Sequence, residues 1–238
     1  RLLDGADPTP TGPTPDGIVD RRGAGFTGIL GELLTSGETV LVGVADVPRR
    51  RESLETLVAG LAPAGLAVAA WDALARDRAL AGEFSHLVAL DPPPGGTSDP
   101  LLAAAPCAHL AWGPAEVEFA LAVWRAELEL RPALVDSFRS LRELDDPASP
   151  AALELALRGS GRYPRSPELC SRVLCVLREL SLVELSLDPP SCRVLEGTRT
   201  DLELSPLYRA CRERYGEIER RLAAERAAPA RETTARAS

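Results

Sequence analysis

Lysine and methionine are both absent from the sequence, so all 27 basic residues among its 238 positions are arginines. Without a lysine ε-amino group, the chain cannot supply a P-loop lysine, a Schiff base or a Ser–Lys dyad. Enzyme classes that depend on those groups are therefore excluded. A chain that starts at Arg1 and contains no methionine is also expected to be a fragment or a processed piece of a longer protein.

Long apolar runs are missing as well. The sequence has no stretch of about 18 uncharged apolar residues, which a membrane-spanning helix requires. Its first residues do not combine cationic side chains with an apolar segment, so no secretory signal peptide is predicted. We expect a cytoplasmic protein with no membrane partner.

Residues that ligate metals or act as nucleophiles are few. The two histidines are His86 and His109, and a G-x-S-x-G nucleophile motif is absent. Cys107 and His109 lie close in sequence, but no second pair of ligating residues is nearby, so we expect no metal or cofactor in this chain. We interpret the histidines as structural and the five cysteines as small buried hydrophobic residues in a reducing cytoplasm.

The net charge of −8 is unevenly distributed along the chain. Residues 1–132 contain 10 arginines against 18 acidic residues, whereas residues 133–238 contain 17 of each. A uniformly basic nucleic-acid-binding protein is excluded, because contact with phosphates needs local positive charge. A local arginine-lined surface in the second half remains compatible with this composition.

The first half alternates helical patterns with short apolar runs. Residues 1–16 are rich in proline, threonine and glycine, and we interpret them as a linker. In residues 17–131, helical patterns occupy 26–36, 49–61 and 73–81, and apolar runs occupy 39–45, 66–70, 86–90 and 109–112. Such alternation predicts an α/β domain with a parallel sheet covered on both faces, RecA-like or Rossmann-like in outline.

The second half is mainly helical. Pro132, Pro150 and Pro167 each open a helical pattern, and strand-like segments at 182–187 and 192–195 follow. Three helices and a hairpin predict a winged-helix-like α+β domain at 132–200. A C-terminal helix is expected at 201–226, its apolar residues packing on its own domain, and a disordered tail at 227–238.

Two motifs suggest nucleotide binding but lack parts of the required pattern. Residues 23–28 read G-x-G-x-x-G, yet little strand-like sequence precedes them, so a glycine-rich turn that lets a helix pack closely is the alternative. Asp91 follows an apolar run where a Walker B carboxylate would lie, but three prolines come next. We therefore predict a degenerate RecA-like domain that does not hydrolyse nucleotides.

The helix at 167–180 is the candidate recognition helix of the winged-helix-like domain. Its outward face mixes acidic and basic residues. Arginine can contact phosphate through two donors, so nearby arginines are the candidate contacts with DNA or a partner protein. These candidates are Arg162, Arg165, Arg172, Arg178 and Arg193.

The order of several segments resembles the C-terminal region of the actinobacterial single-stranded-DNA-specific exonuclease RecJ. The resemblance is carried by VDRRGAG (19–25), ETVLVGVADVPRRR (38–51), HLVALDPPP (86–94), AHLAWGPAEVEFA (108–120), YPRSPELCSRVLCVLRELSLVEL (163–185) and ELSPLYRACRERYGEIERRL (203–222). It covers nearly the whole chain after the linker, and the order of the motifs is more specific than any one of them.

The resemblance implies a 5′→3′ exonuclease that degrades single-stranded DNA in recombination and repair. In that family, an N-terminal domain with Asp- and His-rich motifs binds Mn²⁺ or Mg²⁺ and performs catalysis. No such motif occurs here, so no catalytic residue is carried over. The chain is expected to be an accessory module that contacts single-stranded DNA or a repair protein beside an upstream nuclease domain in cis. The alternative is a protein-interaction module with a pseudo-helicase fold.

Overall fold

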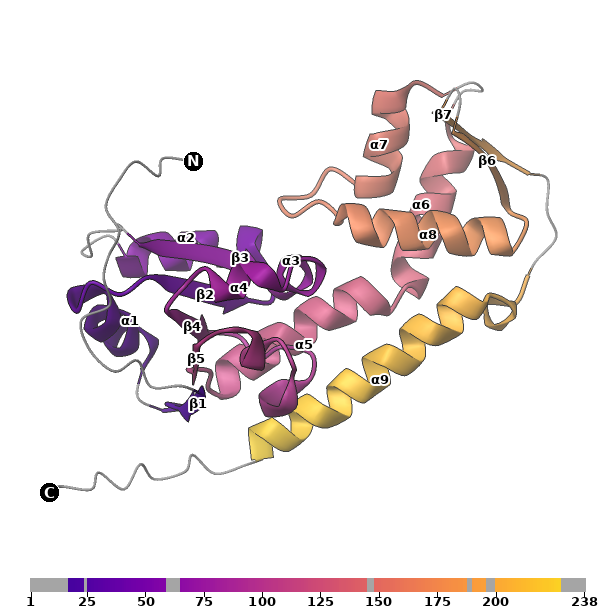
Figure 1. Cartoon of the computed structure of the whole chain (residues 1–238). Coiled ribbons are helices and arrows are strands. Elements are labelled where there is room, and N and C mark those ends of the chain that lie inside the picture. Colours follow the sequence, from indigo (N-terminus) through magenta and orange to yellow (C-terminus); the bar gives the residue numbers. More distant parts are fainter. Residues whose placement is uncertain are drawn as a thin grey trace, which may run out of the picture. The chain divides into compact units, whose positions relative to one another are not determined.

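The computed structural model describes residues 17–23, 25–58, 65–144, 148–187, 190–195 and 200–227. The expected linker at 1–16 and most of the expected tail lie outside these residues. The described chain divides into two compact units (Figure 1). The first contains residues 17–120 together with 221–227, and the second contains residues 121–220. The division falls within a helix, upstream of the boundary expected after residue 131.

A five-stranded parallel sheet forms the centre of the first unit. The strands are β1 (Gly17–Asp20), β2 (Val40–Val44), β3 (Leu66–Ala70), β4 (His86–Ala89) and β5 (Cys107–Leu110). Their order in the sheet is β1-β5-β4-β2-β3, and every pairing is parallel. The expected α/β class with a parallel sheet is therefore confirmed.

Helices connect these strands. They are α1 (Phe26–Thr35), α2 (Val47–Val58), α3 (Trp71–Arg76), α4 (Ala79–Gly82) and the first half of α5 (Pro114–Leu128), with short 3₁₀ turns η1 (Gly96–Ser98) and η2 (Leu102–Ala104). The single helix expected at 73–81 is two short helices, because the chain leaves helical geometry at Asp77, with φ −131° and ψ 88°. The end of the helix expected at 49–61 lies outside the described residues.

Both faces of the sheet are covered, as the continuous apolar character of β2 predicts. All five β2 residues are buried. Alternate residues of a strand point to opposite faces, and Val42 packs in one core cluster with Leu30 of α1 and Leu54 of α2. Gly43 points to the other face, where the Trp71 indole lies directly against it.

Strand β1 is the element that the sequence pattern did not predict. It pairs with β5 at the edge of the sheet, with Val19 opposite His109. A four-residue edge strand that follows a proline-rich segment has too few apolar residues to give a periodic signal. Its place is fixed by pairing with a strand that lies far along the chain, which local sequence cannot reveal.

The second unit contains three helices followed by an antiparallel hairpin, in addition to the second half of α5. These elements are α6 (Arg131–Arg142), α7 (Pro150–Arg158), α8 (Pro167–Glu179), β6 (Val183–Leu187) and β7 (Pro190–Val194). Figure 1 shows the three helices beside one another, with the hairpin next to α7 and α8. The expected element order is thus present.

Serine caps begin three helices, and each serine is followed directly by a proline. The Ser149 and Ser166 hydroxyls accept hydrogen bonds from the Ala152 and Leu169 amides, at 3.2 and 2.9 Å. After η3 (Leu202–Leu204), the Ser205 hydroxyl accepts one from Tyr208 at the start of α9 (Pro206–Ala227). Each cap satisfies an amide that a helix N-terminus would otherwise leave unpaired.

The long helix α9 has an apolar stripe. Cys211, Ile218 and Leu222 on it are buried, whereas Leu204 before the helix is exposed. The expectation that the helix packs on its own domain differs from the structure, because residues from 221 on belong to the first unit and the earlier ones to the second. Among the described residues, no helix combines the length and apolar character that crossing a membrane requires.

Candidate functional site

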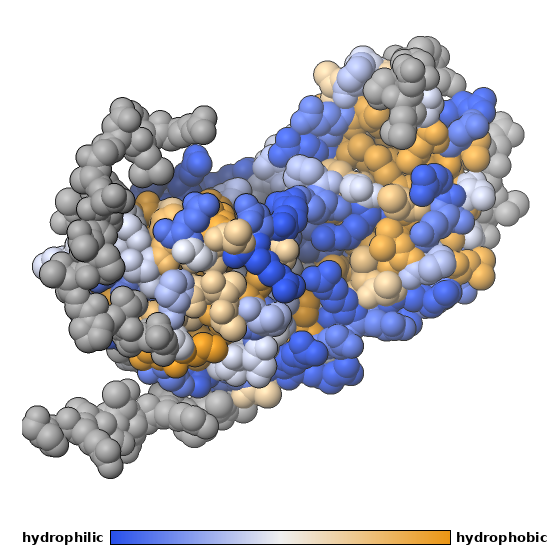
Figure 2. Space-filling model, in the orientation of Figure 1, coloured by the Kyte–Doolittle hydropathy of each residue, from blue (hydrophilic) through white to orange (hydrophobic). Residues whose placement is uncertain are grey.

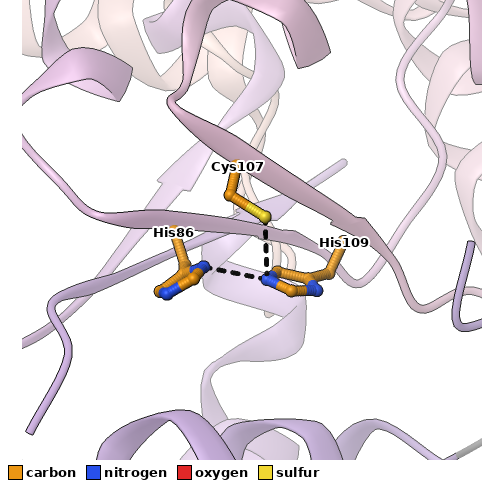
Figure 3. A group of neighbouring side chains, drawn as sticks. All are labelled: His86, Cys107 and His109. Carbon is orange, nitrogen blue, oxygen red and sulfur yellow. Dashed lines mark hydrogen bonds between the residues drawn. The ribbon is translucent and has the colours of Figure 1, made fainter. Parts of the chain in front are cut away.

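Two histidines and a cysteine meet at the amino ends of neighbouring strands. His86 opens β4 and Cys107 opens β5, and the two are direct partners in the parallel register. His109 lies two residues after Cys107 and therefore on the same face of the sheet. Figure 3 shows the three side chains converging, with dashed lines joining His109 to both of the others.

The distances within this cluster are short. The Nε2 atom of His109 lies 2.9 Å from Nδ1 of His86 and 3.5 Å from Sγ of Cys107. One potential ligand atom from each residue lies within 4.8 Å of the other two. All three side chains are almost completely buried, with exposed fractions of 4%, 0% and 2% for His86, Cys107 and His109.

Burial also sets the protonation of the two imidazoles. It lowers the pKa of His109 to about 4, assisted by the positive charges of Arg21 and His86. Burial lowers the pKa of His86 too, although the nearby Glu38 carboxylate opposes the shift. Both rings are therefore neutral at pH 7, and a neutral imidazole keeps a lone pair that can accept a hydrogen bond or bind a metal.

The sequence pattern pointed to Cys107 and His109 as a close pair but not to His86. Cys107 and His109 lie two residues apart on one strand, and His86 reaches them through pairing between β4 and β5. Ligand spacing along a chain detects sites on turns and helices, and it does not detect a site assembled across strands. The interpretation of both histidines as structural remains a prediction.

The carboxyl ends of the strands, opposite the histidine cluster, contain the crossover point of the sheet. It lies between the inner strands β2 and β4. The connections that leave β2 and β4 run to neighbouring strands in opposite directions across the sheet. In α/β folds, the carboxyl ends of the strands at such a point form the usual ligand crevice. Asp91 lies there, directly after β4, and is completely buried. This position is the one that the Walker B comparison indicated.

The crevice is filled by the protein's own side chains. Asp91 pairs with Arg50 of α2 and accepts a hydrogen bond from the Ala45 amide at 2.9 Å. The Arg50 guanidinium lies 3.8 Å from the centroid of the Phe119 ring. Burial raises the pKa of the Asp91 carboxyl, although Arg50 opposes that shift. A carboxylate held in this way has a structural role and is not free to bind a metal–nucleotide complex.

The G-x-G-x-x-G segment follows β1 and leads into α1, so it does lie in a strand–turn–helix unit. Gly23 and Gly25 have positive φ values of 93° and 80°, which glycine adopts without strain. A Cβ added at Gly28 would meet nothing within 4 Å. Close packing at Gly28, as expected both for a dinucleotide fingerprint and for a tightly packed turn, is therefore absent.

Three further observations disfavour dinucleotide binding. The strand before the glycines is at the sheet edge, whereas a dinucleotide fold places it at the crossover point. Asp46 follows β2 at about the distance from the glycines where a dinucleotide fold has an acid for the ribose, but it accepts a hydrogen bond from the Arg49 amide at the start of α2. A hollow of about 160 Å³ beside Gly23 and Trp112 is smaller than the roughly 300–1,000 Å³ of typical ligand pockets.

The five predicted contact arginines have different environments in the second unit. Arg165 pairs with Asp136 at 3.0 Å, and Arg172 pairs with Glu127 at 2.9 Å. Arg193 pairs with Glu184 across the hairpin. Arg162 is exposed and lies over the Tyr163 ring, and Arg178 is exposed on α8.

These contacts divide the predicted set. Arg165 also donates to the Leu157 carbonyl and the Ser137 hydroxyl, so it joins α6 to the end of α7. Arg172 donates to the Glu127 carbonyl and so joins α8 to α5. We assign a structural role to both of these residues. Arg162, Arg178 and Arg193 are exposed, and of these Arg193 pairs with Glu184.

An apolar stripe runs along α8, where Leu169, Val173 and Val176 are buried. None of the five cysteines forms a disulfide. The expectation of small buried residues holds for Cys107, Cys170 and Cys211, whereas Cys175 and Cys192 are only partly buried.

Searches for related proteins add no further evidence. No family model, curated protein or solved structure matches this chain. Its function must therefore be inferred from its own residues and their geometry.

Proposed function

We propose that this chain is an accessory module of a RecJ-like 5′→3′ single-stranded-DNA exonuclease, acting in DNA recombination and repair in the cytoplasm. In this proposal the second unit contacts single-stranded DNA or a repair protein, and a separate metal-dependent nuclease domain performs catalysis. The observation that supports it most is the order of three capped helices and an antiparallel hairpin. We interpret this arrangement as winged-helix-like, a form that often presents a helix to DNA or to a protein.

The first unit supports a non-catalytic role. Its crossover crevice is filled by the Arg50–Asp91 pair, and the chain has no lysine to bind phosphates. We propose that it is a degenerate RecA-like domain that serves as a scaffold. In the described residues, one group of three ligating side chains is found, and it consists of His86, Cys107 and His109.

That group does not fit the Mn²⁺ or Mg²⁺ implied by the resemblance. These ions prefer oxygen ligands, whereas the group offers two nitrogens and a sulfur. No step of phosphodiester hydrolysis is therefore assigned to this chain.

DNA contact is assigned to Arg162 and Arg178, because both are exposed. Electrostatic binding to phosphates releases counterions, so affinity should fall as salt rises, by roughly 0.7 log units per contact for each tenfold increase. Replacing both arginines with alanine should weaken binding and reduce the salt slope by about 1.4, the value for two contacts.

The test is fluorescence anisotropy of the whole chain with a labelled single-stranded oligonucleotide over a range of salt concentrations. Arg51→Ala/Arg78→Ala is the matched control, because both arginines are exposed residues of the first unit and the change removes the same two charges. Equal binding by the Arg162→Ala/Arg178→Ala variant and the control would contradict the assignment. A lack of binding by the wild type at low salt would remove the DNA role altogether.

A protein-interaction module is the second candidate, and specific observations favour it. Three of the five predicted arginines pair with carboxylates, which reduces the positive charge available to phosphates. Figure 2 shows hydrophobic side chains at the surface of the second unit, and Val135 and Leu155 are about half exposed, at 49% and 58%. Apolar surface of this kind suits a protein partner better than a phosphate backbone.

The two candidates differ in their sensitivity to substitution. A Leu155→Ser variant should keep any DNA binding but lose binding to a single-strand-binding protein in a pull-down with purified components. Retention of that protein by Leu155→Ser and its loss in Arg162→Ala/Arg178→Ala would favour the charged surface instead.

A further inference from the structure

We propose that His86, Cys107 and His109 form a binding site for a thiophilic d¹⁰ cation, Zn²⁺ or Cu⁺. This site is separate from the proposed DNA or protein contact and does not depend on it. It lies in the first unit, at the amino ends of β4 and β5, where pairing of the strands brings the three side chains together.

The spacing of the donor atoms is close to that of a coordinated ion. With metal–nitrogen bonds of about 2.0 Å and a metal–sulfur bond of about 2.3 Å, tetrahedral angles place the nitrogens about 3.3 Å apart and nitrogen and sulfur about 3.5 Å apart. The structure has 2.9 Å between His86 Nδ1 and His109 Nε2, and 3.5 Å between His109 Nε2 and Cys107 Sγ. A separation of the two rings by a few tenths of an ångström would admit the ion.

The two facing nitrogens share one hydrogen when no ion is present, because they are within hydrogen-bonding distance. A cation would take the place of that hydrogen, and the ring hydrogen of His109 would then be on Nδ1. The Cys107 thiol would lose its proton to solvent, since the thiolate is the form that binds metals. The two imidazole donors are already in place, because pairing of β4 with β5 holds their facing nitrogens 2.9 Å apart.

The surroundings supply a second layer of contacts. A carboxylate oxygen of Glu38 lies 4.0 Å from Nε2 of His86, the ring nitrogen that does not face His109. A carboxylate that accepts a hydrogen bond from a metal-bound histidine orients its ring and increases its basicity, and Glu38 would take that role if it moved about 1 Å closer to His86. Glu38 comes directly before β2, and its backbone neighbour Thr39 accepts a hydrogen bond from the His86 amide at 3.1 Å.

The donor set selects the class of ion. Imidazole and thiolate suit Zn²⁺ and Cu⁺, whereas Mg²⁺, Ca²⁺ and Mn²⁺ prefer oxygen donors. One thiolate neutralises Cu⁺ completely and leaves a net charge of +1 with Zn²⁺. The Glu38 carboxylate beside His86 could balance that remaining charge, and Arg21 is itself paired with Glu32, so the donor set admits either ion and the experiment distinguishes them.

The experiment measures ions retained by the full chain. Metal-free protein is mixed with Zn²⁺, or with Cu⁺ under anaerobic conditions, passed through a desalting column and analysed for metal and protein. One ion per chain is expected. A competing chromophoric chelator then gives the affinity, and Cys107→Ser and His109→Gln should each lower it at least tenfold.

Cys170→Ser and Cys211→Ser are the matched controls, because both thiols are buried and neither belongs to the cluster. They should retain the ion with unchanged affinity. Circular dichroism checks that each variant is folded. A test that needs no variant is alkylation of the wild type, where the bound ion should slow modification of Cys107 and leave that of Cys170 unchanged.

Each outcome decides the proposal. Retention of Zn²⁺ or Cu⁺ that depends on Cys107 supports it and identifies the ion. Retention of neither ion overturns it, and so does binding that Cys107→Ser and Cys170→Ser affect equally. Failure here leaves the proposed accessory role unaffected, because that role is tested by the arginine variants of the second unit.

Discussion

Replacing Gly43 with alanine should destabilise the first unit through one defined collision. A Cβ at Gly43 would lie 2.4 Å from Cη2 of Trp71 and 2.7 Å from its Cζ2. Ordinary contacts begin near 3.4 Å, so the indole would have to retreat by about 1.0 Å, the difference between 3.4 and 2.4. Trp71 is 1% exposed, and its Nε1 donates a hydrogen bond to the Asp91 carbonyl at 3.1 Å, so it has little room to move.

The expected cost combines three effects. Overpacking a core costs about 1–3 kcal/mol. Weakening of the Trp71 hydrogen bond adds about 0.5–1.5 kcal/mol. Alanine gains about 0.5–1 kcal/mol over glycine in a strand, because it loses less backbone entropy on folding. The balance is a loss of about 2 kcal/mol, or roughly 4–8 °C in the melting temperature of a protein of this size.

Urea unfolding followed by far-ultraviolet circular dichroism measures this effect. Gly28→Ala is the control, because Gly28 is an exposed residue of α1 in the same unit and an added Cβ there meets nothing within 4 Å. It should stabilise the protein by about 0.5–1 kcal/mol. Combining Gly43→Ala with Trp71→Phe removes the colliding atoms and should show a favourable coupling of about 1–2 kcal/mol. If Gly43→Ala were as stable as Gly28→Ala, the packing argument would be refuted.

Further predictions concern single contacts. Arg50→Met should destabilise the first unit by about 3–5 kcal/mol, because it leaves Asp91 buried and unpaired; urea unfolding measures it, and a change below 1 kcal/mol would contradict the structural role of the pair. Ser166→Ala should lower the stability of the protein by about 1 kcal/mol, because it removes the cap of α8. Thermal unfolding beside the wild type checks this value, and recovery of the stability in Ser166→Asn would identify capping as the cause. At pH 8, a thiol reagent should modify Cys175 before Cys170, because Cys170 is buried and burial raises the pKa of its thiol. Peptide mapping by mass spectrometry would show the order, and raising the pH should narrow the difference between the two modification rates.

Much of the fold could be predicted from local patterns. β3 matches the predicted range, and β2 and β4 lie within theirs, because fully buried parallel strands form continuous apolar runs. The helices that open at Ser–Pro pairs were also predictable, since the serine hydroxyl and the proline ring both act within one turn. These features depend on residues close together in the sequence.

The features that the sequence did not predict depend on distant pairing. The position of β1 at the sheet edge is set by β5, and the cluster of His86 with Cys107 is set by the register of β4 against β5. The assignment of Arg165 as a contact residue did not foresee its ion pair with Asp136, because exposure of a basic residue depends on which helix packs beside it. Chemistry assembled across strands and helices is recognisable only when their arrangement is known.

The first unit is built from both ends of the chain, and this affects how the protein can be made. Arg22, just after β1, pairs with Glu225 near the end of α9, across 203 positions of sequence, and Glu225 also accepts a hydrogen bond from the Thr97 amide. A ribosome therefore releases residues 121–220 before the first unit has all of its contacts. The inserted second unit can fold while synthesis continues, whereas the first unit lacks its contacts with residues 221–227 until α9 emerges.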